Sequence, residues 1–129
     1  MDQKVLLAVN GTLMRGLELN PNLIATGASF IRQTCTASAY RLWSIGDAYP
    51  AMQRDDQLGT AITVEVWEIS PDGLLEILAN EPPGLCLGRI ELKDASTVFG
   101  ILGETWICGG QNEITACGGW REYLSLGSQ

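Results

Sequence analysis

The segment VLLAVNGTLMRG, residues 5–16, is the stretch from which the fold of this chain is best approached. It starts with a continuous apolar run over residues 5–9, which predicts a buried first strand. Asn10 and Gly11 follow, and both residue types tolerate the positive φ of a tight turn. Successive backbone N–H groups in such a turn can form a small concave site for an anion. A turn that only ends the strand explains the same residues. The pattern leaves both interpretations open.

The length and charge of the chain exclude several classes of function. A chain of 129 residues is long enough to bury a core, and we expect one domain over residues 1–129. Fifteen acidic and eight basic side chains give a net charge of −7. Because nucleic acids and anionic membranes both require a basic face, we expect neither as a partner. No apolar run reaches spanning length and residues 1–4 lack a signal-peptide layout, so we expect a cytoplasmic location.

The cysteines and the absence of histidine limit the chemistry. No two of the four cysteines form a C-x-x-C pair, and the sequence contains no histidine. We therefore expect reduced cysteines that pack as small apolar side chains, no metal site and no cofactor. Nucleophiles that depend on a Ser-His or Cys-His pair are excluded. Any general base must be a carboxylate, a lysine, a tyrosine or a cysteine.

The pattern along the chain predicts an α+β fold with two short helices and six or seven mostly antiparallel strands. Asn20 is the expected N-cap of a first helix over 21–26, and Ser70 of a second helix that ends at Asn80. Residues 46–59, rich in turn formers and charges, are predicted to form a loop. The expected strands are 5–9, 28–36, 39–45, 60–69, 85–92 and 97–102.

Glu81 is the first candidate for a catalytic residue. It follows the second predicted helix, precedes two prolines that stiffen the backbone, and is close to the apolar residues 85–87. A carboxyl group in such surroundings has a raised pKa, which is the condition for proton transfer near neutral pH. A solvated loop glutamate is the alternative at this position.

Three other side chains are considered for binding. Arg121 lies between Trp120 and Tyr123, and an arginine held by aromatic rings is a good bidentate partner for a carboxylate. A structural arginine that ties down the C-terminus by an ion pair is the equal alternative. Tyr40 offers a hydroxyl donor on a predicted strand. Glu65 interrupts an apolar strand and would need a partner if buried, so we favour an outward-facing position on an edge strand.

The residues after the first strand resemble a known family. Asn10-Gly11-Thr12-Leu13-x-x-Gly16 is similar to the turn that opens gamma-glutamylcyclotransferase-like domains. This resemblance implies that backbone amides of the turn receive the substrate's carboxylate and that Glu81 is the acid/base. Asn10, Pro82 and Leu87 replace residues of the family's pattern. The implied fold is a mixed, mostly antiparallel β-barrel with short flanking helices.

A second resemblance runs along almost the whole chain, to the C-terminal domain of allophanate hydrolases, which has the same cyclotransferase-like fold. Its strongest part is Glu113-Ile114-Thr115-x-x-Gly118-Gly119-Trp120-Arg121-x-Tyr123. It implies small ureido or carbamoyl acids as substrates and breakdown of the N-carboxycarbamate that an amidase domain leaves. Because this chain contains no amidase domain, a separate amidase partner is compatible with it, as is a homodimer. Glu81 itself supports the cyclotransferase interpretation, because allophanate-type domains tend to have an apolar residue there.

The sequence therefore predicts an acid/base enzyme that acts on a small carboxylate-bearing amide or ureido compound. The predicted binding residues are Asn10, Gly11, Thr12, Leu13, Tyr40 and Arg121, with Glu81 as the catalytic residue. The alternative is a non-catalytic module that binds a small anion or assists an amidase.

Overall fold

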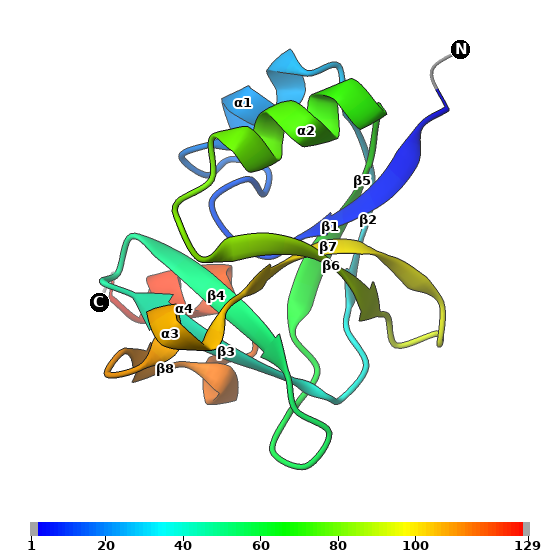
Figure 1. Cartoon of the computed structure of the whole chain (residues 1–129). Coiled ribbons are helices and arrows are strands. Elements are labelled where there is room, and N and C mark those ends of the chain that lie inside the picture. Colours follow the sequence, from blue (N-terminus) through cyan, green and yellow to red (C-terminus); the bar gives the residue numbers. More distant parts are fainter. Residues whose placement is uncertain (1–2, 128–129) are drawn as a thin grey trace.

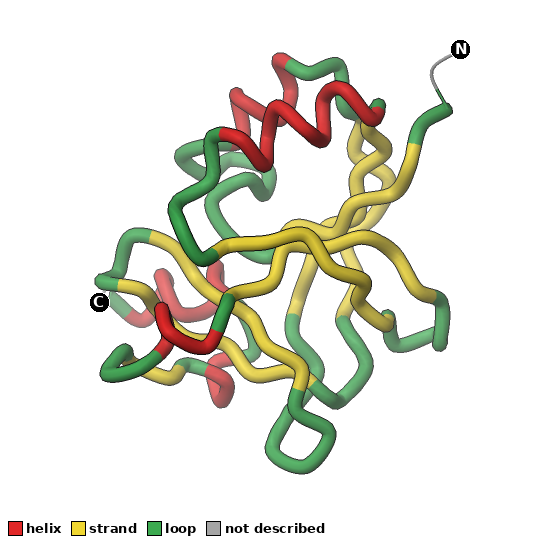
Figure 2. The backbone as a smooth tube through the Cα atoms, viewed as in Figure 1, coloured by secondary structure: helices red, strands yellow, loops and turns green. Residues whose placement is uncertain are grey.

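The computed structural model describes residues 3–127, which form two β-sheets with short helices around them (Figures 1 and 2). The strands are β1 (Val5–Val9), β2 (Ser29–Cys35), β3 (Tyr40–Ile45), β4 (Tyr49–Arg54), β5 (Thr63–Ile69), β6 (Leu85–Glu91), β7 (Thr97–Gly103) and β8 (Asn112–Glu113). The helices are α1 (Asn20–Ala25), α2 (Pro71–Ala79), α3 (Thr105–Cys108) and α4 (Trp120–Leu126), with one 3-10 turn, η1 (Thr115–Cys117).

The larger sheet has five strands in the order β2-β5-β1-β7-β6, with β1 at its centre. β1 runs antiparallel to β5 and parallel to β7. Leu7, Ala8 and Val9 are all buried, which explains why β1 has a continuous apolar sequence and no polar alternation. Figure 1 shows α1 and α2 together at one end of this sheet. The strand predicted over residues 5–9 is confirmed at both ends.

The smaller sheet has the order β4-β3-β8, and neither β4 nor β8 was predicted from the sequence. β4 forms a hairpin with β3 inside the segment 46–59 that was predicted to be a loop. Pro50, a strong loop signal, lies in β4, which is an edge strand of this sheet and can tolerate the missing N–H. The loop prediction was wrong because pairing with β3 at the edge of the sheet outweighs the local turn signal of these residues.

No continuous ladder closes the strands of residues 3–127 into a barrel. The two edge strands of the larger sheet, β2 and β6, are joined just beyond their ends by one bridge between Thr36 and Leu92. The observed architecture is thus a mixed α+β arrangement of two sheets with few helices. The closed barrel stays a prediction.

The two predicted helices, α1 and α2, are present, but only α2 has the predicted cap, and α3 and α4 were not predicted. Ser70 Oγ accepts a hydrogen bond from Gly73 N at 3.0 Å, and Pro71 is the first residue of α2. Asn20 is not a cap; it is the first residue of α1, and its Nδ2 donates to the Leu13 carbonyl at 2.8 Å. The buried Asn20 side chain therefore ties α1 to the turn after β1.

The main core contains side chains from the larger sheet and from β3, β4, α1, α2 and α4. Its largest fully buried apolar side chains include Leu7, Met14, Leu23, Leu42, Met52, Ile62, Ile69, Ile90 and Trp120. All four cysteines are free. Within residues 3–127, the helices are too short to cross a membrane.

Candidate functional site

Hydrogen bonds to its backbone carbonyl groups hold the turn after β1 in place. Met14 N donates to the Gly11 carbonyl at 3.0 Å, which closes the turn, and Leu19 N donates to the Thr12 carbonyl at 2.9 Å. The Leu13 carbonyl accepts the hydrogen bond from Asn20 described above. Three successive carbonyl oxygens are thereby bound to protein donors, so the orientation of their peptide planes is fixed.

The N–H groups of the same three residues have no such partners. Within residues 3–127, no protein acceptor is bonded to the backbone N–H of Gly11, Thr12 or Leu13. Gly11 and Leu13 are buried, and buried N–H groups without a partner are rare because each costs free energy. All three residues line a cavity at the end of β1. The turn therefore offers successive unused donors, the arrangement that binds a carboxylate or another oxyanion.

Gly11 also allows the turn to lie against β4. A Cβ atom built on Gly11 would come within 2.5 Å of Pro50 Cδ. Pro50 and Tyr49 line the same cavity from the other side. A glycine is needed here because of this close approach and not because of a positive φ.

Glu81 lies in the same cavity, brought there by the short segment after α2. Its N–H extends the end of α2 by donating to the Leu78 carbonyl at 3.2 Å, and Pro82 follows at once. The side chain is half-buried, and burial raises the pKa of the Glu81 carboxyl. The structure thus brings together Glu81 and the turn, 68 or more residues apart in the sequence (Glu81 to Leu13). The cavity that they share is lined by Val9, Asn10, Gly11, Thr12, Leu13, Tyr49, Pro50, Glu81, Leu85 and Ile101.

The enclosed volume of this cavity is about 20 Å³. A cavity of that size holds about one water-sized group. A larger ligand can therefore place only one small end group between the turn and Glu81, and the rest of it must lie outside.

Asn10 takes part in the site mainly by positioning. Its buried Nδ2 donates to the Ile101 carbonyl at 3.0 Å, which links the end of β1 to β7. Among the described residues, no donor is bonded to its Oδ1. Asn10 lines the cavity as predicted, with this oxygen as an acceptor still available.

Tyr40 and Arg121 are not brought into the cavity. The Tyr40 side chain is fully buried in the core, and its hydroxyl accepts a hydrogen bond from Glu91 N at 3.0 Å. Arg121 Nη2 donates to Glu65 Oε2 and to the Arg15 carbonyl, each at 3.1 Å. The structure thus favours the alternative in which Arg121 is a structural arginine held by an ion pair.

Glu65 is the polar residue whose position the sequence analysis got wrong. It lies on β5, a central strand, and its side chain is 0% exposed. Oε1 accepts from Arg15 N at 2.9 Å and from Trp67 Nε1 at 3.1 Å. Oε2 accepts from Arg15 Nε and Arg121 Nη2, both at 3.1 Å. A carboxylate buried with a full set of donors is stable, so the outward-facing edge position is wrong.

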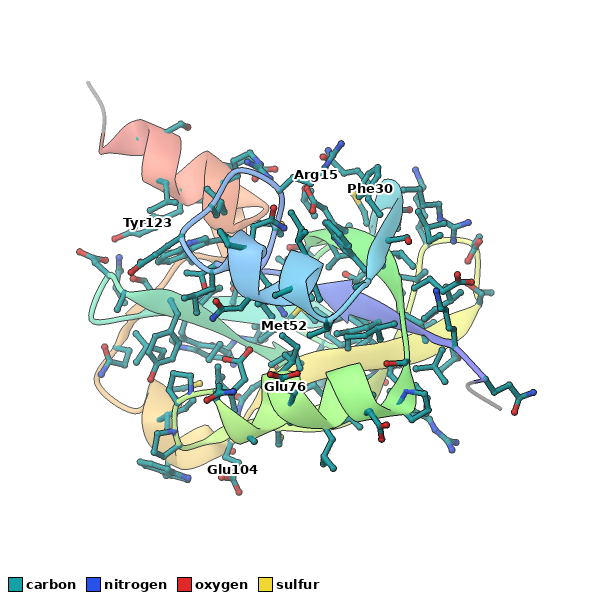
Figure 3. The ribbon with its side chains drawn as sticks, turned by 90° about the horizontal axis from the view of Figure 1, so that it is seen from above. Arg15, Phe30, Met52, Glu76, Glu104 and Tyr123 are labelled. Atoms are coloured by element: carbon teal, nitrogen blue, oxygen red, sulfur yellow. The ribbon has the colours of Figure 1, made fainter. Side chains whose placement is uncertain are left out.

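Arg15 links the buried Glu65 carboxylate to the loop that contains the turn. Its guanidinium stacks on the Phe30 ring at 3.7 Å from the ring centroid, and Figure 3 shows the two side chains together. Arg15 follows the turn by two residues, so its bonds to Glu65 fix the far end of the turn on the sheet. The only signal for this in the sequence was a glutamate inside an apolar strand.

The described residues thus define a class of protein: a small α+β domain with unused backbone donors after its first strand and a half-buried glutamate opposite them. The chain belongs to the allophanate hydrolase C-terminal domain family, whose family model matches residues 5–125.

Two curated relatives are urea amidolyases. The one from Lachancea kluyveri is 24% identical over 132 residues, and the one from Saccharomyces cerevisiae is 26% identical over 127 residues. These matches cover 97% and 93% of this chain but only 7% of each relative. The chain therefore corresponds to one small part of those enzymes.

Several solved structures have a similar fold. A uropathogenic E. coli-specific protein is 49% identical with a TM-score of 0.93, and the match covers 95% of this chain and 97% of that one. Kluyveromyces lactis allophanate hydrolase is 27% identical with a TM-score of 0.90, over 96% of this chain and 21% of the hydrolase. An AIG2-like protein from Mus musculus, 19% identical with a TM-score of 0.62 over 84% and 81% of the two chains, shares the fold.

Proposed function

We propose that this protein is an acid/base enzyme that acts on a small carboxylate-bearing amide or ureido compound. The observation that carries the proposal is the cavity shared by Glu81 and the three unused N–H groups of Gly11, Thr12 and Leu13. The N–H groups bind the substrate's carboxylate without a counter-cation, since their dipoles are already fixed by the bonded carbonyls.

Glu81 moves the proton in this scheme. Because burial raises the pKa of its carboxyl, a larger fraction is protonated near neutral pH than for an exposed glutamate. Among residues 3–127, Glu81 is the only carboxylate that lines the cavity, and the sequence contains no histidine to take its role. A protonated Glu81 donates to the leaving nitrogen of an amide, and the resulting carboxylate accepts a proton from the attacking group.

Membership of the family supports a small carbamoyl or ureido acid as the substrate, and similarity to urea amidolyases supports a reaction linked to an amidase. A non-catalytic module that binds a small anion or assists a separate amidase is the second candidate. The small enclosed volume of the cavity favours this second candidate, because about 20 Å³ accepts an end group and not a whole substrate in this conformation.

The test is turnover by the wild-type chain and by Glu81→Gln. Allophanate, N-carbamoyl amino acids and γ-glutamyl amides are each incubated with protein, and their loss is followed by NMR. Removal of a general acid/base lowers the rate about 100-fold or more. Affinity for propionate, measured from backbone amide shifts of residues 11–13, should change less than about threefold, since Gln keeps the shape of Glu.

Glu18→Gln is the matched control, because Glu18 is exposed on the loop after the turn and does not line the cavity. It should turn over substrate at the wild-type rate. Full turnover by Glu81→Gln would contradict the role of Glu81. Propionate binding without turnover of any compound by the wild-type chain would favour the accessory module.

A further inference from the structure

A groove of about 310 Å³ lies on the other side of Glu81, between α1 and α2. Leu13 and Glu81 line both this groove and the small cavity at the turn. A ligand that places its carboxylate at the turn therefore has one adjoining space for the rest of its atoms. The groove is large enough for a short chain, whereas the cavity is not.

The polar lining of the groove is made of acceptors. Among the residues that the structure describes, the ionisable ones in this lining are Glu76 on α2 and Glu81, and no Lys or Arg contributes to it. Figure 3 shows the Glu76 carboxylate between α2 and α1. Asn80 uses its Nδ2 to bond the Glu76 carbonyl at 2.9 Å, which leaves its Oδ1 as an acceptor, and Asn22 adds an amide from α1.

This lining selects against a second anion. Two carboxylates in one ligand would place one of them near Glu76, in a chain that already has a net charge of −7. Like charges at short range repel, whereas an ammonium group beside a carboxylate is attracted and finds carbonyl-type acceptors for its remaining protons.

We propose that the groove between α1 and α2 binds the ammonium group of the ligand whose carboxylate lies at the turn, with Glu76 as its partner. The substrate is then a zwitterion, an amide or ureido compound that has both a carboxylate and a free ammonium group, and not a dicarboxylate. This inference rests on the proposed function, since the turn fixes one end of the ligand.

The proposal is tested with the ¹⁵N-labelled chain and ω-amino acids of increasing length, from 3-aminopropanoate to 6-aminohexanoate. Each is compared with the unsubstituted acid of the same length and with the dicarboxylate that replaces the ammonium by a carboxylate. Dissociation constants are read from the backbone amide shifts of residues 11–13. We expect at least one ω-amino acid to bind about two- to fivefold more tightly than its matched acid, as for a solvent-exposed ion pair.

Two variants of α2 distinguish a direct contact between the ammonium group and Glu76 from the attraction of the protein's overall negative charge. Glu76→Gln should remove the preference for the ammonium compound. Asp72→Asn removes the same charge from the same helix at an exposed residue that does not line the groove, and should leave the preference unchanged. Both changes are at exposed positions, so the fold is kept.

If butyrate shifts the turn amides but no ω-amino acid binds more tightly than its matched acid, the groove assignment is wrong while the carboxylate site stands. An equal loss of preference in Asp72→Asn also overturns the groove assignment. If no compound shifts the turn amides, both the carboxylate site and the groove are wrong.

Discussion

Arg121 Nη2 lies 3.1 Å from Glu65 Oε2, so an arginine of the C-terminal helix α4 pairs with a carboxylate in the middle of the larger sheet. The same Nη2 also donates to the Arg15 carbonyl. Glu65, Arg15 and Arg121 thus join β5, the loop of the turn and the C-terminal helix at one point. This cluster stabilises the loop that carries the candidate site without touching the cavity.

Glu65→Gln should lower the free energy of unfolding by about 2 kcal/mol or more. The substitution leaves a buried amide among donors that need an anionic acceptor, and an unsatisfied buried group costs about 1–3 kcal/mol. Urea denaturation followed by tryptophan fluorescence measures the loss. Glu68→Gln, on the same strand but only partly buried, should stay within about 0.5 kcal/mol of the wild type. Equal losses in the two variants would contradict the special role of Glu65.

Arg121→Met should affect stability and not ligand binding. Its guanidinium bonds Glu65 and the Arg15 carbonyl, and it does not line the cavity. We expect a loss of about 1 kcal/mol in unfolding free energy, with the dissociation constant for propionate changed by less than about twofold. A tenfold weaker affinity at unchanged stability would instead support the substrate-binding role predicted from the sequence.

Gly11→Ala should weaken both stability and binding. The added methyl group would overlap Pro50 Cδ, and relief of that overlap must move the turn or β4. Overpacking of this kind costs about 1–3 kcal/mol. Thermal unfolding and propionate titration measure the two effects. Gly109→Ala is the control, because a Cβ atom there would lie 4.0 Å from the nearest atom outside its chain neighbours, the Trp106 carbonyl oxygen. A wild-type-like Gly11→Ala would rule out a tight fit of the turn against β4.

The stability of the protein should depend on pH through Glu81. Its folded-state pKa is raised above the ordinary value of 4.5 by burial. Between these two pKa values the folded state binds more protons than the unfolded state, so stability falls as pH rises through this window. The contribution is fully present below pH 4.5 and is lost as pH rises through the raised pKa.

Glu81→Gln removes this pH dependence. Its unfolding free energy minus that of the wild type should therefore increase as pH rises from 4.5 and level off above the raised pKa. Urea denaturation of both proteins at half-unit steps of pH measures the difference. A difference that is the same at every pH would show that the carboxyl of Glu81 is not perturbed by folding.

The local structure of the chain follows closely from the sequence. The apolar run 5–9, the Ser70 cap with Pro71, and the break at Pro82 each depend on residues within one or two turns of each other. Such short-range effects act before any long-range contact forms, so a pattern in the sequence is enough to predict them. Strand β4 and the expected Asn20 cap are exceptions. A proline such as Pro50 is compatible with a strand at a sheet edge, and Asn20 is the first residue of α1 and not its cap.

By itself, the sequence determined the mixed α+β composition, a turn directly after β1, and Glu81 as a carboxylate in apolar surroundings. The tertiary structure decided which of the charged side chains form ion pairs. Glu65 is buried because β5 pairs with both β2 and β1, and Arg121 binds it because α4 packs at that point, away from the turn. These outcomes depend on strand order and on contacts between residues 50 or more positions apart. No local preference of the chain encodes them, because an isolated glutamate or arginine has the same propensities whether its strand or helix lies at an edge or in the centre.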